Sequence, residues 1–427
     1  MTVTPLADAA PTTAQDRCPQ HFRYWENLAD PRVQRVVRGV KKVTGFDLFP
    51  TTAQATAFCD DMYAGDPVAE LFVAEVFDGA IGPAEGRAMV LQAVQHGVET
   101  VPNAPESMKT LFREFEDVPA WVDPDLVEAG AAVWRRWGTM LFSVAGATTL
   151  EIYTEAAVAT PLSLAGGYAG DNALRRFLET AKFWIDLSQP GALLTPGSQG
   201  RATAMMVRVM HVNVRRRVAE HPEWRAEDWG LPISQAYMLL TLIGGSVAPA
   251  VALWPLGYQT TPTDMRALLH FQRYMGYLLG IRTKWYPESV GDCIRALAMT
   301  IISRSYDAGE HGAELVESFP RAFGPRDGHR GLRRLREGYN LRIYSAYTAL
   351  FMAPRTRARY DMPRAFPWVL IPIARIPLVT TMELARRFVP GAGPALEKLM
   401  VWHRENWHHA QMDGREAEFE AKGALRR

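Results

Sequence analysis

The sequence contains few cysteines and has almost no net charge. Its 427 residues include three cysteines, 47 lysines and arginines, and 46 aspartates and glutamates, so the formal net charge is 47 − 46 = +1. Three cysteines exclude a disulfide-rich scaffold and any zinc or iron–sulfur site with four cysteine ligands. A near-neutral chain also lacks the basic surface that neutralises nucleic-acid phosphates. We therefore expect neither a nucleic-acid partner nor a cysteine-built metal site.

Several common catalytic motifs are also missing. The chain has no Cys-x-x-Cys-His for covalent haem, no glycine-rich phosphate loop, and no Gly-x-Ser-x-Gly. Glu-x-x-His occurs once, from Glu405 to His408, whereas a carboxylate-bridged di-iron site needs the motif on each of two helices. We therefore interpret His408 and His409 as part of a solvated C-terminal segment.

The N-terminal residues are polar and rich in alanine, threonine and proline. They lack the basic and apolar regions of a secretory signal peptide. We expect residues 1–20 to form a disordered tail and the protein to be cytoplasmic. No low-complexity linker or internal repeat divides the remainder, which predicts a single domain over residues 21–427.

Apolar residues recur at spacings of three and four along the chain, and strand-like alternation is scarce. Hydrophobic residues make up 48% of the sequence, which is too high for a disordered protein. The pattern predicts one all-α domain, with helices that include 21–40, 124–144, 147–160, 171–188 and 201–220.

Two apolar stretches raise the question of a membrane. Ala236–Tyr258 carries no charged residue over 23 positions, which is long enough to span a bilayer. Glycines and prolines interrupt it, so we favour a buried central helix. Phe366–Val379 contains three prolines and is too broken to span. It could pack on the core, line a tunnel or touch a membrane surface, and membrane contact is not the favoured alternative.

One histidine lies within an apolar helical stripe. Val207, Met210, Val214 and Val218 fall on one helix face, and His211 lies among them. A buried imidazole needs a partner, because an unpaired buried polar group costs a few kcal/mol. The pattern alone favours a core histidine bonded to a backbone carbonyl, and an iron ligand is the alternative.

The preceding helix, 171–188, carries an arginine at the edge of its apolar face. Arg176 lies four residues before Thr180, so we expect the guanidinium and the hydroxyl to meet on one side of the helix. An arginine in that position can hold an anion such as a haem propionate. A surface salt bridge is the alternative.

Five segments in register resemble a known family. Arg176–Lys182, Val207–Arg215, His221–Trp224, Pro232–Gln235 and Arg273–Ile281 are similar to segments of the latex clearing protein (rubber oxygenase) and MpaB-type oxygenase family. The resemblance covers about residues 120–310. It implies an all-α, globin-like helical core around non-covalent haem b, with additional peripheral helices.

The resemblance also implies site residues. His211 takes the position of the proximal iron ligand, and Arg176 and Thr180 take positions beside the haem. His270 is the second candidate for a cofactor-binding histidine. Glu179 stands where a lysine is frequent in the rubber oxygenases, and it could accept or relay a proton.

The chain departs from the rubber oxygenases at a second position. Those enzymes carry a glutamate upstream of the motif arginine, whereas residues 156–170 contain no carboxylate and have Thr160 and Ser163 in the corresponding region. We therefore expect a haem b oxygenase that uses dioxygen on a hydrophobic unsaturated molecule smaller than rubber, such as an isoprenoid. A haem peroxidase or peroxygenase, a haem-based sensor, and a cofactor-free membrane-associated protein are the alternatives. The oligomeric state is left open.

Overall fold

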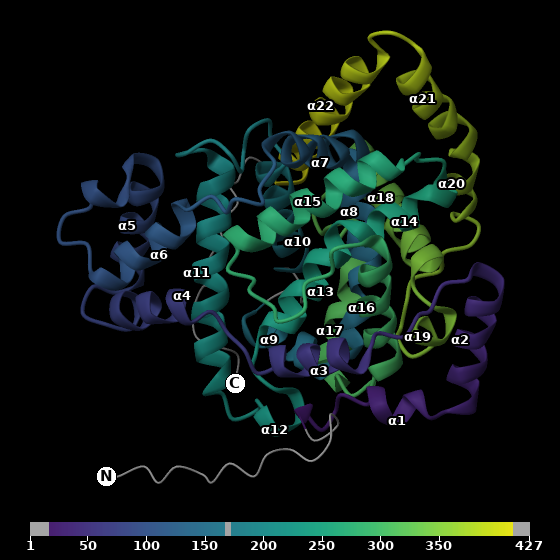
Figure 1. The fold of residues 1–427 in the computed structure, drawn as a ribbon. Helices are drawn as coiled ribbons and strands as arrows, with labels where there is room; N and C mark the ends of the chain where they lie inside the picture. Colours follow the sequence, from purple (N-terminus) through teal and green to yellow (C-terminus); the bar gives the residue numbers. More distant parts are fainter. Residues whose placement is uncertain (1–16, 167–171, 413–427) are drawn as a thin grey trace.

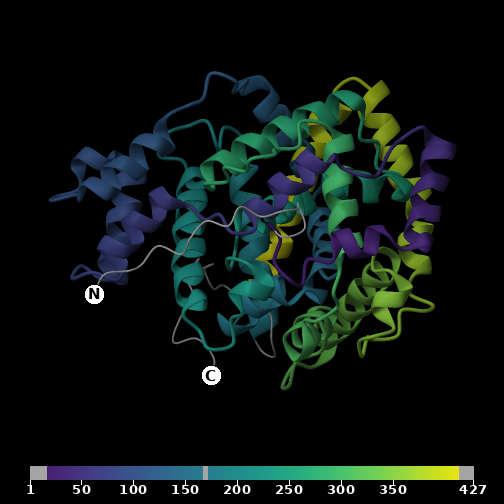
Figure 2. The same cartoon turned by 60° about the horizontal axis from the view of Figure 1, so that its bottom comes forward.

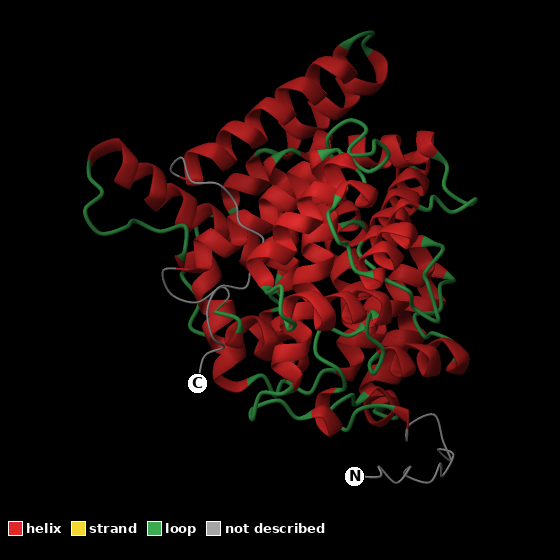
Figure 3. Ribbon diagram, turned by 90° about the vertical axis from the view of Figure 1, so that its left-hand side faces the viewer, coloured by secondary structure: helices red, strands yellow, loops and turns green. Residues whose placement is uncertain are grey.

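The computed structural model describes residues 17–166 and 172–412, and this part of the chain is built from helices without a strand (Figure 1, Figure 3). The all-α prediction is therefore confirmed. The α-helices are α1 (Tyr24–Leu28), α2 (Pro31–Thr44), α3 (Thr52–Asp61), α4 (Pro67–Phe72), α5 (Pro83–His96), α6 (Glu106–Glu116), α7 (Pro124–Trp137), α8 (Thr139–Thr149), α9 (Ala156–Leu164), α10 (Asn172–Leu187), α11 (Gln199–Ala219), α12 (Ala226–Trp229), α13 (Gln235–Gly245), α14 (Val247–Leu253), α15 (Pro262–Leu278), α16 (Val290–Ser303), α17 (Gly309–Arg321), α18 (Gly331–Phe351), α19 (Pro354–Arg357), α20 (Leu370–Ala374), α21 (Ile376–Phe388) and α22 (Ala392–Met412). Short helical turns are η2 (Val73–Phe77), η3 (Val98–Thr100), η4 (Ile152–Thr154) and η5 (Trp254–Leu256).

Three of the predicted helices are divided. The helix expected over 21–40 becomes α1 and α2, because Asp30 caps a new helix whose first residue is Pro31. The helix expected over 124–144 stops at Gly138, whose φ of +55° does not continue a right-handed helix. The chain restarts there as α8, which turns toward the centre of the molecule and ends at Thr149, inside the helix expected over 147–160.

Helices α7 and α15 pack closely because a glycine lies between them. A Cβ atom at Gly130 would lie 2.5 Å from the carbonyl oxygen of Ala267. The missing side chain therefore lets the two backbones approach. Helices α10 and α11 pack beside this pair, and α11 forms a long column between the α4–α6 group and the rest of the protein (Figure 1).

Three arginines hold α11 against the α4–α6 group. They recur every seven residues and therefore share one side of the helix. Each is buried and each pairs with a carboxylate: Arg201 with Glu116 at 2.8 Å, Arg208 with Asp66 at 2.7 Å and with Glu114 at 2.7 Å, and Arg215 with Glu70 at 3.1 Å. The three guanidinium groups are in the interior of the fold, and the Asp66 carboxylate is buried with Arg208, so these pairs specify how α11 docks.

The uncharged stretch Ala236–Tyr258 forms α13 and α14, with a break at Ser246. The segment Gln235–Leu256 is long and apolar enough to cross a membrane, yet 67% of its apolar window is buried inside the fold. The structure therefore supports the interpretation as a buried central element.

The C-terminal helices leave the body of the protein and then return to it (Figure 1). Helix α22 packs against α7 and α10, and His408 is buried with its Nε2 donating to the carbonyl oxygen of Leu178 at 2.9 Å. The prediction that His408 is solvated was therefore wrong, because α22 covers α10. Helices α21 and α22 form a hairpin whose tip projects from the body (Figure 1).

The N-terminal segment is attached to α3 earlier than predicted. Cys18 forms a disulfide bond with Cys59, and the Arg17 guanidinium pairs with Asp60 at 2.7 Å. The structured chain therefore begins by Arg17, within the tail expected over residues 1–20. Residues 1–16 lie outside the described part of the chain.

Candidate functional site

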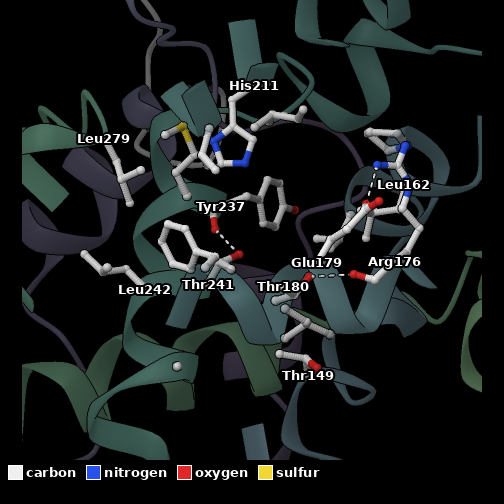
Figure 4. Close-up of a pocket in the computed structure, with 18 of the residues that line it drawn as sticks. Thr149, Leu162, Arg176, Glu179, Thr180, His211, Tyr237, Thr241, Leu242 and Leu279 are labelled. Carbon is white, nitrogen blue, oxygen red and sulfur yellow. Dashed lines mark hydrogen bonds and ion pairs between the residues drawn. The ribbon is translucent and has the colours of Figure 1, made fainter. Parts of the chain in front are cut away.

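A cavity of about 320 Å³ lies in the interior, at the junction of α8, α9, α10, α11, α13 and α15. This volume is within the range of cofactor and small-molecule sites. Most of its lining is apolar, including Trp134, Phe177, Phe183, Trp184, Met275 and Phe319. A few polar side chains reach into this apolar space, and Figure 4 shows how they are placed.

His211 borders the cavity from α11, and Val207, Met210 and Val214 of the predicted stripe line it as well. Its Nδ1 is buried, and neither ring nitrogen has a hydrogen-bond partner among the residues that the structure describes. A core histidine bonded to a carbonyl would show such a partner, so the structure does not support that alternative.

Burial governs the protonation of this imidazole. Removal from water, with a smaller contribution from the nearby Arg215 guanidinium, lowers the pKa of His211 to about 4. The ring is therefore neutral at physiological pH, which is the form that binds a metal.

A short cluster of charged side chains borders the cavity from α10. Arg176 Nη1 donates to Glu179 Oε2 at 3.0 Å, and Arg175 Nη1 donates to Glu179 Oε1 at 3.2 Å. Arg176 and Glu179 line the cavity and Arg175 does not. Glu179 is 5% exposed, so its carboxylate is an internal group that two guanidinium groups neutralise. Sequence reasoning did not anticipate this pairing.

Thr180 also lines the cavity, and its hydroxyl bonds to the backbone of Arg176. Thr180 Oγ1 donates to the backbone carbonyl oxygen of Arg176 at 3.1 Å. This bond within one helix turn is common for threonine, because the hydroxyl reaches the carbonyl four residues earlier. The arginine and the threonine therefore share the cavity wall, one helix turn apart on α10.

His270 is not among the residues that line the cavity, so the structure does not support the prediction that it binds the cofactor. Its Nε2 accepts a hydrogen bond from the backbone amide of Asp123 at 2.8 Å, and its ring packs against Trp121. Helix α15 instead presents Met275 to the cavity. His270 thus stabilises the start of α7.

Two hydroxyl-bearing residues of α13 that the sequence reasoning missed also line the cavity. Tyr237 and Thr241 are four residues apart, which places them on one face of the helix (Figure 4). Burial, together with the charges of Glu155 and Asp307, raises the pKa of Tyr237, so its phenol stays protonated. Their spacing within the uncharged stretch 236–258 was the available signal.

The region upstream of Arg176, where the sequence has Thr160 and Ser163 and no carboxylate, places both of these residues inside the fold. Thr160 is buried, and Ser163 Oγ lies 2.9 Å from His311 Nδ1 and 3.1 Å from Glu314 Oε2. Residues 167–171 lie outside the described part of the chain. Of the described lining residues, Glu179 is the one carboxylate.

The described part of the chain offers no metal site built from protein ligands alone. The described residues contain no cluster of three or more histidine, cysteine, aspartate or glutamate side chains that could hold a metal ion. Haem iron needs as few as one protein ligand, because the porphyrin supplies four nitrogens. A neutral, unpartnered imidazole in an apolar cavity and a guanidinium on its wall fit that requirement.

The comparisons with known proteins agree with this site. The family described as "ER-bound oxygenase mpaB/B'/Rubber oxygenase, catalytic domain" matches residues 131–387. The chain therefore belongs to the mpaB/rubber oxygenase family, and the match extends beyond the expected limit near residue 310. Membership of this family supports the prediction that the protein is an oxygenase.

A solved structure shares the fold. The latex clearing protein in its closed state superposes with a TM-score of 0.57 at 20% sequence identity, covering 80% of this chain and 91% of that chain. At this identity the likeness concerns the fold alone. No curated protein sequence matches the chain.

Proposed function

We propose that this protein is a haem b-dependent oxygenase that acts with dioxygen on an unsaturated hydrophobic molecule, such as an isoprenoid. The observation that supports this most directly is His211, a neutral and unpartnered imidazole at the wall of an apolar cavity. When bound, haem supplies the redox chemistry that activates dioxygen, which protein side chains alone do not provide.

The residues of the chain have separate roles in this proposal. His211 on α11 would hold the iron, and Arg176 on α10 would pair with a haem propionate. The apolar lining would bind the hydrocarbon and exclude water. The Tyr237 phenol would donate a hydrogen bond to an oxygen atom in the cavity, and the Glu179 carboxylate, held by Arg175 and Arg176, would offset one of their two positive charges.

An absorption spectrum of the purified protein tests the cofactor, because bound haem gives a Soret band. Product analysis with terpenoid and polyene substrates under oxygen, and separately with peroxide, then tests the reaction. We expect oxygen-dependent products. Products that require peroxide would indicate a peroxygenase, and ligand binding to the haem without any turnover would indicate a sensor. A colourless protein that takes up no added haem would contradict the proposal.

The charged cluster on α10 offers a matched pair of variants. Arg176→Ala is expected to weaken haem binding by about tenfold to a hundredfold, since a charge-assisted bond to a partly buried anion is worth roughly 1.5–3 kcal/mol. Arg175→Ala removes the other partner of Glu179 but no cavity contact, so it should retain haem. Thr180→Val should also retain haem better than Arg176→Ala, because valine is nearly isosteric with threonine and no charge is removed. Haem content by pyridine haemochrome measures all three, and equal retention by Arg176→Ala and Arg175→Ala would place Arg176 away from the cofactor.

A cytoplasmic location stays a prediction, and the Cys18–Cys59 bond provides its test. Disulfide bonds persist in oxidising compartments and are rare in the cytosol, so this bond argues for an oxidising one. Thiol alkylation in freshly lysed cells, followed by denaturation and mass spectrometry, counts the reduced cysteines. A cytoplasmic protein is expected to show three reduced cysteines. A protein in an oxidising compartment is expected to show only Cys293, which is the free cysteine of the structure.

A further inference from the structure

Exposed apolar side chains gather on the C-terminal helices. Of the 22 large hydrophobic side chains that are exposed in the described chain, nine lie between residues 366 and 402. On α21, Leu378, Leu384 and Phe388 are 62%, 45% and 75% exposed, and Leu384 and Phe388 lie four residues apart on one helix face. On α22, Leu399 and Trp402 are 47% and 61% exposed. An apolar surface of this kind marks a site of contact with another molecule or a membrane.

The surface continues onto the body of the protein at the base of the hairpin. The turn η5 packs against α21, and its Trp254 is 62% exposed. Helix α20 lies between α18 and α21, and its Leu370 is 52% exposed. The exposed surface is thus formed by several packed elements and is convex where the hairpin projects (Figure 1, Figure 3).

The charges around this surface are positive. Within residues 364–403 both carboxylates are engaged by arginines of the body: Glu383 lies 3.6 Å from Arg136, and Glu397 lies 2.5 Å from Arg135. The exposed cations Arg387 and Lys398 have no ion-pair partner among the described residues. Helices that combine exposed Leu, Phe and Trp with Lys and Arg are typical of membrane-surface elements.

We propose that the surface formed by α20, α21 and α22 binds the face of a lipid bilayer that contains anionic lipids. Phe388 and Trp402 would enter the boundary between headgroups and acyl chains, while Arg387 and Lys398 would contact lipid phosphates. A second copy of the chain fits less well, since a symmetric contact would bring the same unpaired cations together. This inference goes beyond the proposed function and does not depend on bound haem.

Vesicle flotation of the full-length protein tests the inference. We expect the protein to float with phosphatidylcholine vesicles that contain phosphatidylglycerol, and to be released by high salt. Phe388→Ser with Trp402→Ser should weaken binding at least about tenfold, because each change removes a large apolar contact. Arg387→Ala with Lys398→Ala should weaken binding to the anionic vesicles and leave the weaker affinity for phosphatidylcholine alone unchanged.

The control is a pair of exposed leucines far from the hairpin. Leu71→Ser with Leu91→Ser changes α4 and α5, which lie at the opposite end of the molecule from α21 in both Figure 1 and Figure 2. This variant should bind vesicles like the wild type, and circular dichroism should show that all variants are folded. Absence of flotation, or equal loss in the control, would overturn the inference. A dimer that Phe388→Ser with Trp402→Ser converts to monomer, without vesicle binding, would assign the surface to a second copy instead.

Discussion

Replacement of His211 by alanine is expected to yield a folded protein that retains little haem. His211 is the histidine that lines the described cavity, so its removal leaves the iron without a protein ligand. Loss of hydrogen bonds around a metal ligand alone costs about tenfold to a hundredfold in affinity, and loss of the ligand should cost more. The affinity for haem should therefore fall by roughly a hundredfold or more. Pyridine haemochrome, which measures haem per protein, should then show little bound haem.

The fold of this variant should persist. Val207, Met210 and Val214 still form the apolar stripe of α11, although loss of bound haem will lower the thermal midpoint by linkage. His270→Ala is the matched control, because His270 lies outside the cavity against Trp121. We expect His270→Ala to retain haem. A folded His211→Ala protein with full haem content and an unchanged spectrum would refute the assignment of the ligand.

Replacement of Arg208 by methionine is expected to destabilise the protein by about 3–5 kcal/mol. Arg208 is 1% exposed and forms two hydrogen bonds to Asp66, at 2.7 and 3.0 Å, and a third to Glu114 at 2.7 Å. The variant would leave Asp66 buried without its counter-charge, and an unpaired buried carboxylate is costly. Asp66 also caps α4 through the amide of Ala69, so the damage should extend to the docking of α4.

Urea unfolding of the haem-free protein measures this effect without a contribution from cofactor binding. Arg216→Met on the same helix is the control. Arg216 pairs with Asp78, and their side chains are 37% and 45% exposed, so this pair should contribute about 0–1 kcal/mol to the free energy of unfolding. Similar losses for both variants would show that the buried ion pairs do not hold α11 in place.

The sequence alone was sufficient for the class of fold and for the placement of His211 on an apolar helix face. Helical spacing and the scarcity of strand patterns predicted an all-α protein, and the structure confirms it. The stripe around His211 was readable because one helix face repeats every three to four residues. The predicted helix ends were less accurate. The helix expected over 124–144 breaks at Gly138, where the backbone has a positive φ, and the spacing of apolar residues does not predict that conformation.

Tertiary structure decided what each polar side chain contacts. Spacing along a helix specifies which residues share a face, but it does not specify which distant segment covers that face. Asp66 lies 142 residues from Arg208, so nothing local predicted that this arginine is buried. His270 and His211 both lie on partly apolar helices, yet the packing of Trp121 against α15 placed His270 outside the cavity. The sequence therefore determined the helices and their apolar faces, whereas long-range packing decided which charges are buried and which side chains form the site.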